Sequence, residues 1–485
     1  MVSRPGSKML RNRLDFQPHI CNDRINECIN ECCKARRRGP MGAETGRSKT
    51  GSDDALYRKV TLYLMPLLIT CYTVSYLDRI NISFAKPHMM GDLGLNEAVY
   101  GLGAGLFFLG YAASEVPSNL LMHRFGPRRW LSRILMTWGL ISMGMMLVWS
   151  EYSFYIFRIA LGIGEAGLFP GAIFYLMRWY PTERRATVTS LFYLAAPLAG
   201  IFGAPISGLI IAHMHGTASL AGWQWMFLLE GIPAVLLAFV VWFKLSDTIE
   251  GASWLSSSEK VRLRANIDAE NVRKPEMGIL DVFKNVDVLL LAAILFGIVL
   301  AQSGIFFYLP SLIKGAGVTD TVQLGIYSAV PYAGAVIVML AVGRSSDRKR
   351  ERFLHFVGSC LFGVAGFLIS VWFKHNLVLV LIGLSMALGG VMAVLPVFWS
   401  LPTAALKDVS AAAGIAFINS IGLTAGFFAP FIIGFLTQST NTLDLGIYCV
   451  AGIWAACVAV SVVYFTRQKC RSAPVTVGAS AGAAR

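Results

Sequence analysis

The chain has 485 residues, of which 55% are hydrophobic and 14% are charged, whereas an average soluble domain has about 25% charged residues. This composition indicates a membrane protein. The net charge of +14 could suggest a nucleic-acid partner, but that needs a basic face on a soluble domain. No soluble stretch of adequate length lies outside the apolar runs, so the composition argues against nucleic-acid binding and against a soluble catalytic domain.

Residues 1–56 form a polar leader, rich in Arg, Gly, Ser and Asp. This composition predicts disorder. The leader lacks the apolar core and the cleavage site of a secretory signal. Met41 opens a shorter leader directly before the first apolar run, so an alternative start at Met41 stays open, and residues 1–40 could be a wrongly assigned upstream extension.

The nine cysteines show no repeated metal-ligand spacing. We expect reduced thiols, no disulfide and no metal ion. The glycine-rich segment GLGAG at 101–105 follows no predicted strand and precedes no lysine, so it favours helix packing over a phosphate loop. The sequence thus predicts no cofactor and no enzyme.

Twelve apolar stretches are long enough to cross a bilayer as helices, since a span needs roughly 20 mostly apolar residues. The predicted spans are 60–82, 100–122, 130–149, 153–178, 186–212, 223–244, 287–312, 323–344, 353–372, 377–400, 411–436 and 444–466.

The distribution of basic residues tests this number, because cytoplasmic loops hold most Lys and Arg. With the N-terminus inside, the inside segments and the inner ends of the spans hold 37 of the 42 basic residues. The outside loops hold Lys86, Lys314 and Lys374, and Arg79 and Arg158 lie within spans. We therefore expect an all-α membrane protein with twelve spans and with the N- and C-termini both cytoplasmic.

The long loop 245–286 divides the spans into two six-helix bundles, 57–244 and 287–466, and residues 467–485 form a tail. Similar residues recur at a nearly constant offset, as in Ala204-Pro205 and Ala429-Pro430. Two related halves are typical of secondary transporters.

Charged side chains inside a span are rare and mark substrate or ion pathways, because each costs at least about 2.5 kcal/mol at membrane depth. All six predicted here lie in the first half. They are Asp78, Arg79, Glu115, Arg158, Glu165 and Glu230.

Their depths suggest a charge network. Arg158 and Glu165 are two helical turns apart and share one helix face, and Arg158 lies at a depth that allows an ion pair with Asp78. Such a pair would free Arg79 to bind a carboxylate through two parallel hydrogen bonds. Burial favours the neutral form of an acid, so Asp78 and Glu165 are candidate proton carriers. For Glu115 and Glu230 we favour structural roles.

Two inside loops, HRFGPRR at 123–129 and GRSSDRKR at 343–350, resemble the paired cytoplasmic signature of the major facilitator superfamily. In this resemblance Arg124, Asp347 and Arg348 belong to the gating loops. The first copy departs from the pattern, with Asn119 in place of Gly and His123 in place of Asp. That departure puts the usual acidic gate of the first loop in doubt.

The segments YLDRIN (76–81), GEAGLFPGAIFYL (164–176), WQWMFLLEGIPA (223–234) and AAAGIAFINSIG (411–422) are similar to those of the anion:cation symporter family, which includes phthalate, hydroxyphenylacetate and tartrate permeases. The resemblance covers about residues 57–468. It implies roles for seven matching residues: proton coupling by Asp78 and Glu165, substrate binding by Arg79, Tyr76, Tyr111 and Asn419, and a charge network at Arg158.

These features together predict a proton-coupled symporter of the inner membrane that imports a small organic anion by alternating access. Sugar-acid carriers of the family have a Gln in the fifth span where this chain has Ala195, Ala196 and Pro197, so we expect an aromatic or short hydroxy- or dicarboxylate. We expect a monomer whose partners are the anion, protons and the lipid bilayer. Exchange of one organic anion for another remains the alternative, and the short loops argue against a signalling sensor.

Overall fold

The computed structural model describes residues 51–268, 284–349, 351–405 and 409–472, apart from some side chains within these ranges. The predicted leader up to residue 50, with Met41, lies outside them. Every regular element in the described part of the chain is a helix. Twelve of these helical segments are long and apolar enough to cross a membrane, and each coincides with a predicted span. The all-α prediction with twelve spans is therefore confirmed.

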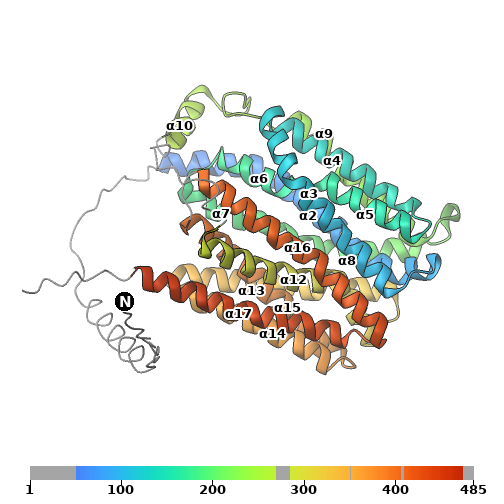
Figure 1. The fold of residues 1–485 in the computed structure, drawn as a ribbon. Coiled ribbons are helices and arrows are strands. Elements are labelled where there is room, and N and C mark those ends of the chain that lie inside the picture. Colours follow the sequence, from blue (N-terminus) through green and yellow to red (C-terminus); the bar gives the residue numbers. More distant parts are fainter. Residues whose placement is uncertain (1–50, 269–283, 350, 406–408, 473–485) are drawn as a thin grey trace, which may run out of the picture. The chain divides into compact units, whose positions relative to one another are not determined.

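The first six spans are built from eight helices (Figure 1). They are α2 (Gly51–Leu93), α3 (Glu97–Phe125), α4 (Pro127–Gly144), α5 (Glu151–Glu165), α6 (Leu168–Met177), α7 (Thr182–Tyr193), α8 (Ala195–Met214) and α9 (Gly222–Lys244). Within this half, α4 packs against α9 and α3 against α5.

The last six spans are continuous helices. They are α12 (Val286–Gly315), α13 (Thr321–Lys349), α14 (Phe353–Trp372), α15 (Leu377–Ala405), α16 (Val409–Thr440) and α17 (Asp444–Ser472). Here α15 packs against α13 and α14, and α12 packs against α16 and α17.

The fourth span is interrupted between α5 and α6, where Gly167 has φ +92°. Only glycine adopts this backbone region at little cost. The Ser118 hydroxyl of α3 donates to the carbonyl of Ala166 at 2.6 Å and accepts from the Trp130 indole at 3.0 Å. The break thus leaves the carbonyl of Ala166 without a helical partner, and the Ser118 hydroxyl binds it instead. Glu165 is the last residue of α5, directly before this break.

The two halves meet along two helix pairs, α3 with α16 and α8 with α13. Glycines allow this close approach. A Cβ atom on Gly208 would lie 2.7 Å from the carbonyl oxygen of Thr321, and one on Gly325 would lie 2.6 Å from that of Ala204. Gly434 would meet the backbone of Glu97 at 2.5 Å in the same way.

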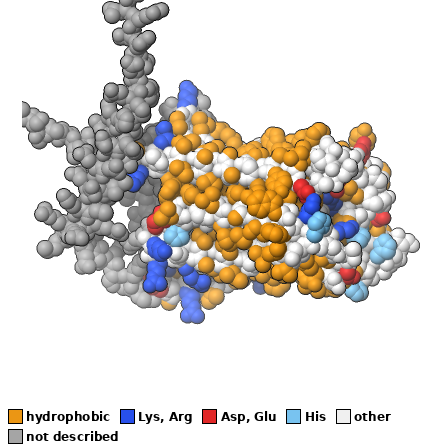
Figure 2. Space-filling model, turned by 90° about the horizontal axis from the view of Figure 1, so that it is seen from below, with side chains coloured by type: hydrophobic (Ala, Val, Ile, Leu, Met, Phe, Trp, Pro, Cys, Tyr) orange, Lys and Arg blue, Asp and Glu red, His pale blue; other side chains and the backbone are white. Residues whose placement is uncertain are grey.

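Apolar side chains cover the outside of the helices. Figure 2 shows a broad apolar band across one face, with Lys, Arg, Asp, Glu and His toward its two ends. Large apolar residues such as Leu62, Phe202, Phe243 and Phe435 are more than half exposed. Such a surface suits contact with lipid chains.

Helix α10 (Ser257–Asp268) lies within the segment predicted as the linker. Lys59 of α2 forms an ion pair with Glu259 of α10 at 2.8 Å. Trp254, just before α10, stacks on Tyr63 with ring centroids 4.2 Å apart and on Trp179 at 5.6 Å. The first part of the linker is therefore fastened to the first half, and we call the end of the helices that carries α10 (Figure 1) the α10 end.

Candidate substrate and proton site

Arg79 of α2 and Glu165 of α5 form a buried ion pair. Two guanidinium nitrogens of Arg79, Nε and Nη2, donate to Oε1 of Glu165 at 2.9 and 2.6 Å. The Ser75 hydroxyl, one helical turn before Arg79, donates to the same oxygen at 2.5 Å. The second carboxylate oxygen of Glu165 has no hydrogen-bond partner. All three donors therefore converge on one oxygen of Glu165. Arg79 does not bind the two carboxylate oxygens through two parallel hydrogen bonds.

Aromatic rings surround the Arg79 guanidinium. Its central carbon lies 5.2 Å from the ring centres of Tyr76 and Tyr111 and 5.5 Å from that of Phe107. These distances allow cation–π attraction, which strengthens when the site is shielded from water. The guanidinium is thus held in place from several sides while one edge of it reaches the central cavity.

Asp78 points into a different environment from Arg79. It accepts hydrogen bonds from Ser142, from the Trp138 indole at 2.5 Å, and from Asn81 at 3.1 Å. Successive residues of a helix diverge by about 100°, so Asp78 faces α4 while Arg79 faces α5. The two charges that are adjacent in sequence therefore serve two separate clusters.

The ion pair between Asp78 and Arg158 that their depths allow is not formed in the described conformation. Within the described part of the chain Arg158 instead donates to the backbone carbonyls of Gly103 and Ala104, at 3.3 and 3.1 Å. The guanidinium also lies 5.0 Å from the Phe107 ring centre. Arg158 thus fastens α5 to α3, and Arg79 is not freed by it.

A central cavity of about 60 Å³ lies between the two halves. Its wall includes all four predicted substrate residues, and nine of its 17 lining residues are aromatic. They are Tyr72, Tyr76, Arg79, Phe108, Tyr111, Phe169, Tyr193, Leu295, Val299, Gln302, Ser303, Phe306, Phe307, Leu395, Trp399, Asn419 and Leu423.

This volume equals that of about two water molecules, whereas ligand pockets usually measure about 300–1,000 Å³. In the described conformation the cavity is therefore smaller than a usual ligand pocket.

The second half contributes amides to the wall. Asn419 of α16 donates a hydrogen bond to Glu115 of α3, and this bond crosses between the halves. Gln302 of α12 is 8% exposed, and its amide nitrogen has no partner. Glu115, for which a structural role was expected, thus takes part in the contact beside the cavity.

The gating-loop residues lie away from this cavity. Arg124 and Arg348 are exposed, and the side chain of Asp347 lies outside the described residues. Asp247, just after α9, accepts from the backbone nitrogen of Arg128 at 2.8 Å. Since His123 replaces the usual acid in this loop, Asp247 supplies a carboxylate there from a different segment.

Several polar partners in the two clusters were not predicted: Ser75, Asn81, Trp138 and Ser142. Helical spacing offered a signal for the first two, since Ser75 precedes Arg79 by four residues and Asn81 follows Asp78 by three. Trp138 and Ser142 lie four apart on α4, but no sequence feature connects them with α2.

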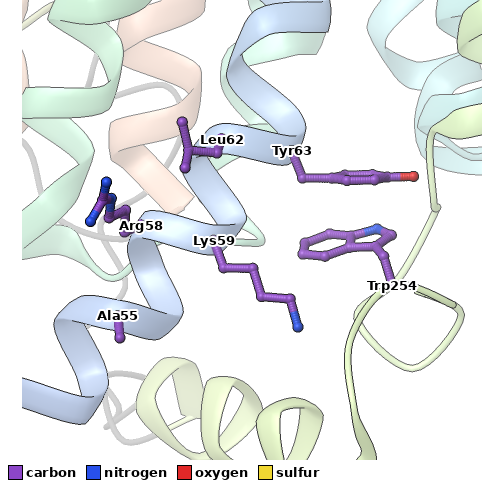
Figure 3. A pocket seen from close by; sticks show the side chains of 6 residues that line it. All are labelled: Ala55, Arg58, Lys59, Leu62, Tyr63 and Trp254. Carbon is purple, nitrogen blue, oxygen red and sulfur yellow. The ribbon is translucent and has the colours of Figure 1, made fainter.

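A second, larger hollow of about 500 Å³ lies near α10 and is lined by Ala55, Arg58, Lys59, Leu62, Tyr63 and Trp254 (Figure 3). The Tyr63 and Trp254 rings lie face to face along one side of it, and Lys59 extends toward α10. It shares no residue with the central cavity. The central cavity, whose wall includes Arg79 and the other three predicted substrate residues, is therefore the candidate transport site.

Residues 68–430 match the sequence model of the Major Facilitator Superfamily. A protein of Agrobacterium vitis, named as a candidate tartrate transporter, is 42% identical over 408 residues, which cover 84% of this chain and 94% of that protein. A quinolone resistance transporter of Acinetobacter baumannii is 40% identical over 394 residues, covering 81% and 90% of the two chains.

Among solved structures, a bacterial homologue of the human lysosomal transporter Spinster, in an inward-facing and occupied conformation, shares the fold with a TM-score of 0.68. It is 16% identical and covers 83% of this chain and 96% of its own. The chain therefore belongs to the Major Facilitator Superfamily, and it is a multi-pass transporter of the inner membrane rather than an enzyme.

Proposed function

We propose that this transporter imports a small organic carboxylate together with protons. The observation that carries the proposal is the Arg79–Glu165 ion pair at the wall of the central cavity. A substrate carboxylate and the carboxylate of Glu165 compete for one guanidinium, since both accept the same donors. When Glu165 binds a proton it loses its charge, and Arg79 becomes available to the substrate.

This competition couples the two ligands. Protonation of Glu165 strengthens binding of the anion to Arg79, and by linkage the bound anion favours protonation. Loaded with anion and proton, the site carries less net charge through the membrane than with the anion alone. The halves then rock about the cavity, and loss of the proton on the far side restores the Arg79–Glu165 pair and displaces the substrate.

The substrate class follows from the lining. Nine aromatic rings offer stacking surface, and four of them belong to tyrosines whose hydroxyls, together with Arg79, Ser303 and two side-chain amides, can bind a few oxygen atoms. This wall suits an aromatic or short hydroxy- or dicarboxylate. The name of the tartrate relative supports a short hydroxydicarboxylate, and that of the quinolone relative an aromatic compound.

The test uses the purified full chain. Thermal-shift screening against a panel of carboxylates at acidic and alkaline pH identifies a substrate, and binding should be tighter at acidic pH. In Glu165→Gln the amide has a similar size but cannot bind a proton in this range, so binding should lose its pH dependence. A wild-type pH dependence in Glu165→Gln would overturn the coupling role of Glu165.

Asp78→Asn in proteoliposomes tests the second acid. We expect uptake driven by a pH gradient to be abolished, whereas exchange with preloaded substrate can persist because it moves no net protons. Undiminished gradient-driven uptake would contradict the role of Asp78. If the wild-type protein shows exchange but no response to a pH gradient, the alternative of an organic anion exchanger holds.

A further inference from the structure

Four buried polar residues of the first half lie outside the wall of the central cavity. Asp78 and Asn81 of α2 are 2% and 0% exposed, Glu230 of α9 is 4% exposed, and Ser207 of α8 is 0% exposed. Asn81 donates to Asp78 at 3.1 Å, and Ser207 donates to Oε1 of Glu230 at 2.6 Å. Asn81 and Asp78 are both among the groups close enough to act on the carboxyl group of Glu230. Asn81 therefore stands between two buried acids.

Neither acid forms an ion pair within the described part of the chain, although the charge of the buried Arg158 acts on Asp78. Arg79 pairs with Glu165, and Arg158 binds backbone carbonyls. The groups that act on Glu230 are Ser207 from α8 and Asn81 and Asp78 from α2. Two buried carboxylates that share no ion pair and have one cation at a distance would be strongly destabilising, so we infer that at least one of them holds a proton.

Two orphaned atoms indicate where this proton lies. The amide oxygen of Asn81 and Oε2 of Glu230 are both buried, and neither has a hydrogen-bond partner. Both are acceptors when Glu230 is ionised, so they cannot bond to each other. A proton on Oε2 turns it into a donor, and one hydrogen bond to the Asn81 oxygen would then satisfy both groups.

We propose that Asp78 and Glu230 share one proton across Asn81, and that Glu230 is a proton-binding residue of the transport cycle. When Asp78 is ionised it accepts from the Asn81 amide nitrogen, and Glu230 carries the proton and donates to the amide oxygen. When the amide turns over, its nitrogen donates to an ionised Glu230 and its oxygen accepts from a protonated Asp78. The pair keeps one negative charge in both arrangements, and only the positions of proton and charge are exchanged.

This assignment deepens the proposed function and rests on it for its use in transport. Glu230 lies about four helical turns from Lys244 at the α10 end of α9, whereas Asp78 lies beside the Arg79–Glu165 cluster. Turning over Asn81 therefore moves the charge between α2, the helix that also carries Arg79, and α9. The fourth side chain, Ser207, stabilises the ionised form of Glu230.

The test needs no substrate. Infrared difference spectra of the reconstituted full chain between acidic and alkaline pH report the carbonyl band of protonated carboxylic acids. Glu230→Gln should remove the signal of one acid, because Gln can donate to the Asn81 oxygen as the protonated acid does. Asp78→Asn should remove a signal of the same size, and the double variant should lose no more than either single one.

Glu115→Gln is the matched control. Glu115 is also a buried acid of the first half, but its partner is Asn419, so its loss should add to that of Asp78→Asn. Additive losses for Asp78→Asn and Glu230→Gln, or an unchanged spectrum in Glu230→Gln, would overturn the shared proton.

A second variant covers the case that Glu230→Gln does not fold. Ser207→Ala removes a donor to the ionised form of Glu230, so the acid band should persist to more alkaline pH than in the wild type. A band that titrates as in the wild type would contradict the proposal.

Measurements of uptake driven by a pH gradient distinguish failure of this proposal from failure of the proposed function. With tartrate as the probe, a wild-type protein that ignores a pH gradient argues against the proposed function, and the spectra still test the shared proton. If wild-type uptake follows the gradient and Glu230→Gln responds equally, Glu230 has no part in the cycle.

Discussion

The two halves of this transporter contribute different chemistry to one cavity. The first half brings the charged groups, Arg79, Glu165 and Asp78, and the side-chain hydrogen bonds that they form within the described part of the chain all lie in the same half. The second half contributes amides and rings such as Gln302, Asn419 and Trp399. Breaking a buried ion pair costs several kcal/mol, so a carrier whose ion pair lies within one half can separate its halves at lower cost.

The contacts that cross between the halves fit this division. Beside the cavity they include the hydrogen bond from Asn419 to Glu115, and elsewhere the Tyr100 hydroxyl donates to the carbonyl of Phe307 at 3.2 Å. Neither is an ion pair. The comparison predicts that the proposed proton coupling and the separation of the halves depend on different sets of contacts, which substitutions can separate.

The largest effect is expected at Arg79. Arg79→Lys keeps the positive charge but loses the planar fork that binds a carboxylate through two nitrogens, and a misplaced positioning group can cost about 100-fold. We expect uptake of the identified carboxylate to fall by about that factor. Arg133→Lys is the control, because Arg133 stacks on Trp130 at 4.1 Å outside the cavity wall. Equal losses in both variants would contradict a special role for Arg79.

A substitution that overpacks the interface between the halves should lower the stability of the fold. Gly208→Ala places a Cβ atom 2.7 Å from the Thr321 carbonyl oxygen, and overpacking of this kind costs about 1–3 kcal/mol. We expect a lower unfolding temperature and weaker association of α8 with α13. In Gly452→Ala the new Cβ meets nothing within 4 Å, so this variant should be at least as stable as the wild type, and equal behaviour of the two would contradict the close packing.

A smaller effect is expected from Asn419, which the second half contributes to the cavity wall. Asn419→Ala removes the donor to Glu115, and one hydrogen bond contributes about 1 kcal/mol, or about fivefold in binding. We expect KM for the identified carboxylate to rise by about that factor while the pH dependence stays as in the wild type. Thr424→Ala on the same helix, where the hydroxyl only bonds to the Ile421 carbonyl, should leave KM unchanged. A changed pH dependence in Asn419→Ala would place proton coupling in both halves.

The smallest effect is expected at the linker. The hydrogen bond from Lys59, together with the backbone of Ser256, lowers the pKa of Glu259. An acid with a lowered pKa stabilises the fold above its unfolded pKa of about 4.3, and this contribution is lost as the pH falls through the folded value. Lys59→Gln should therefore cost less than about 1 kcal/mol at neutral pH and nothing at strongly acidic pH. A thermal-unfolding difference that persists there would show that the pair is not electrostatic.

The span count and Arg79 could be predicted because hydropathy and the position of a charge within a span are properties of the local sequence. Tyr76 and Tyr111 were predicted from the resemblance to the anion:cation symporter family. The partner of Asp78 could not be predicted, because depth along a helix does not say which neighbour each face meets, and the side chains of Asp78 and Arg79 diverge. The Asn419–Glu115 bond joins residues 304 positions apart, and no local pattern encodes such a contact.

The fastening of the linker has a practical consequence. Because Trp254 and Glu259 are held by α2 and by Trp179, α10 should move as one rigid unit with the first half. A fluorescent dye on α10, paired with a second dye on α14 of the other half, would turn the rocking of a single molecule into a distance signal without any label entering the membrane-spanning core.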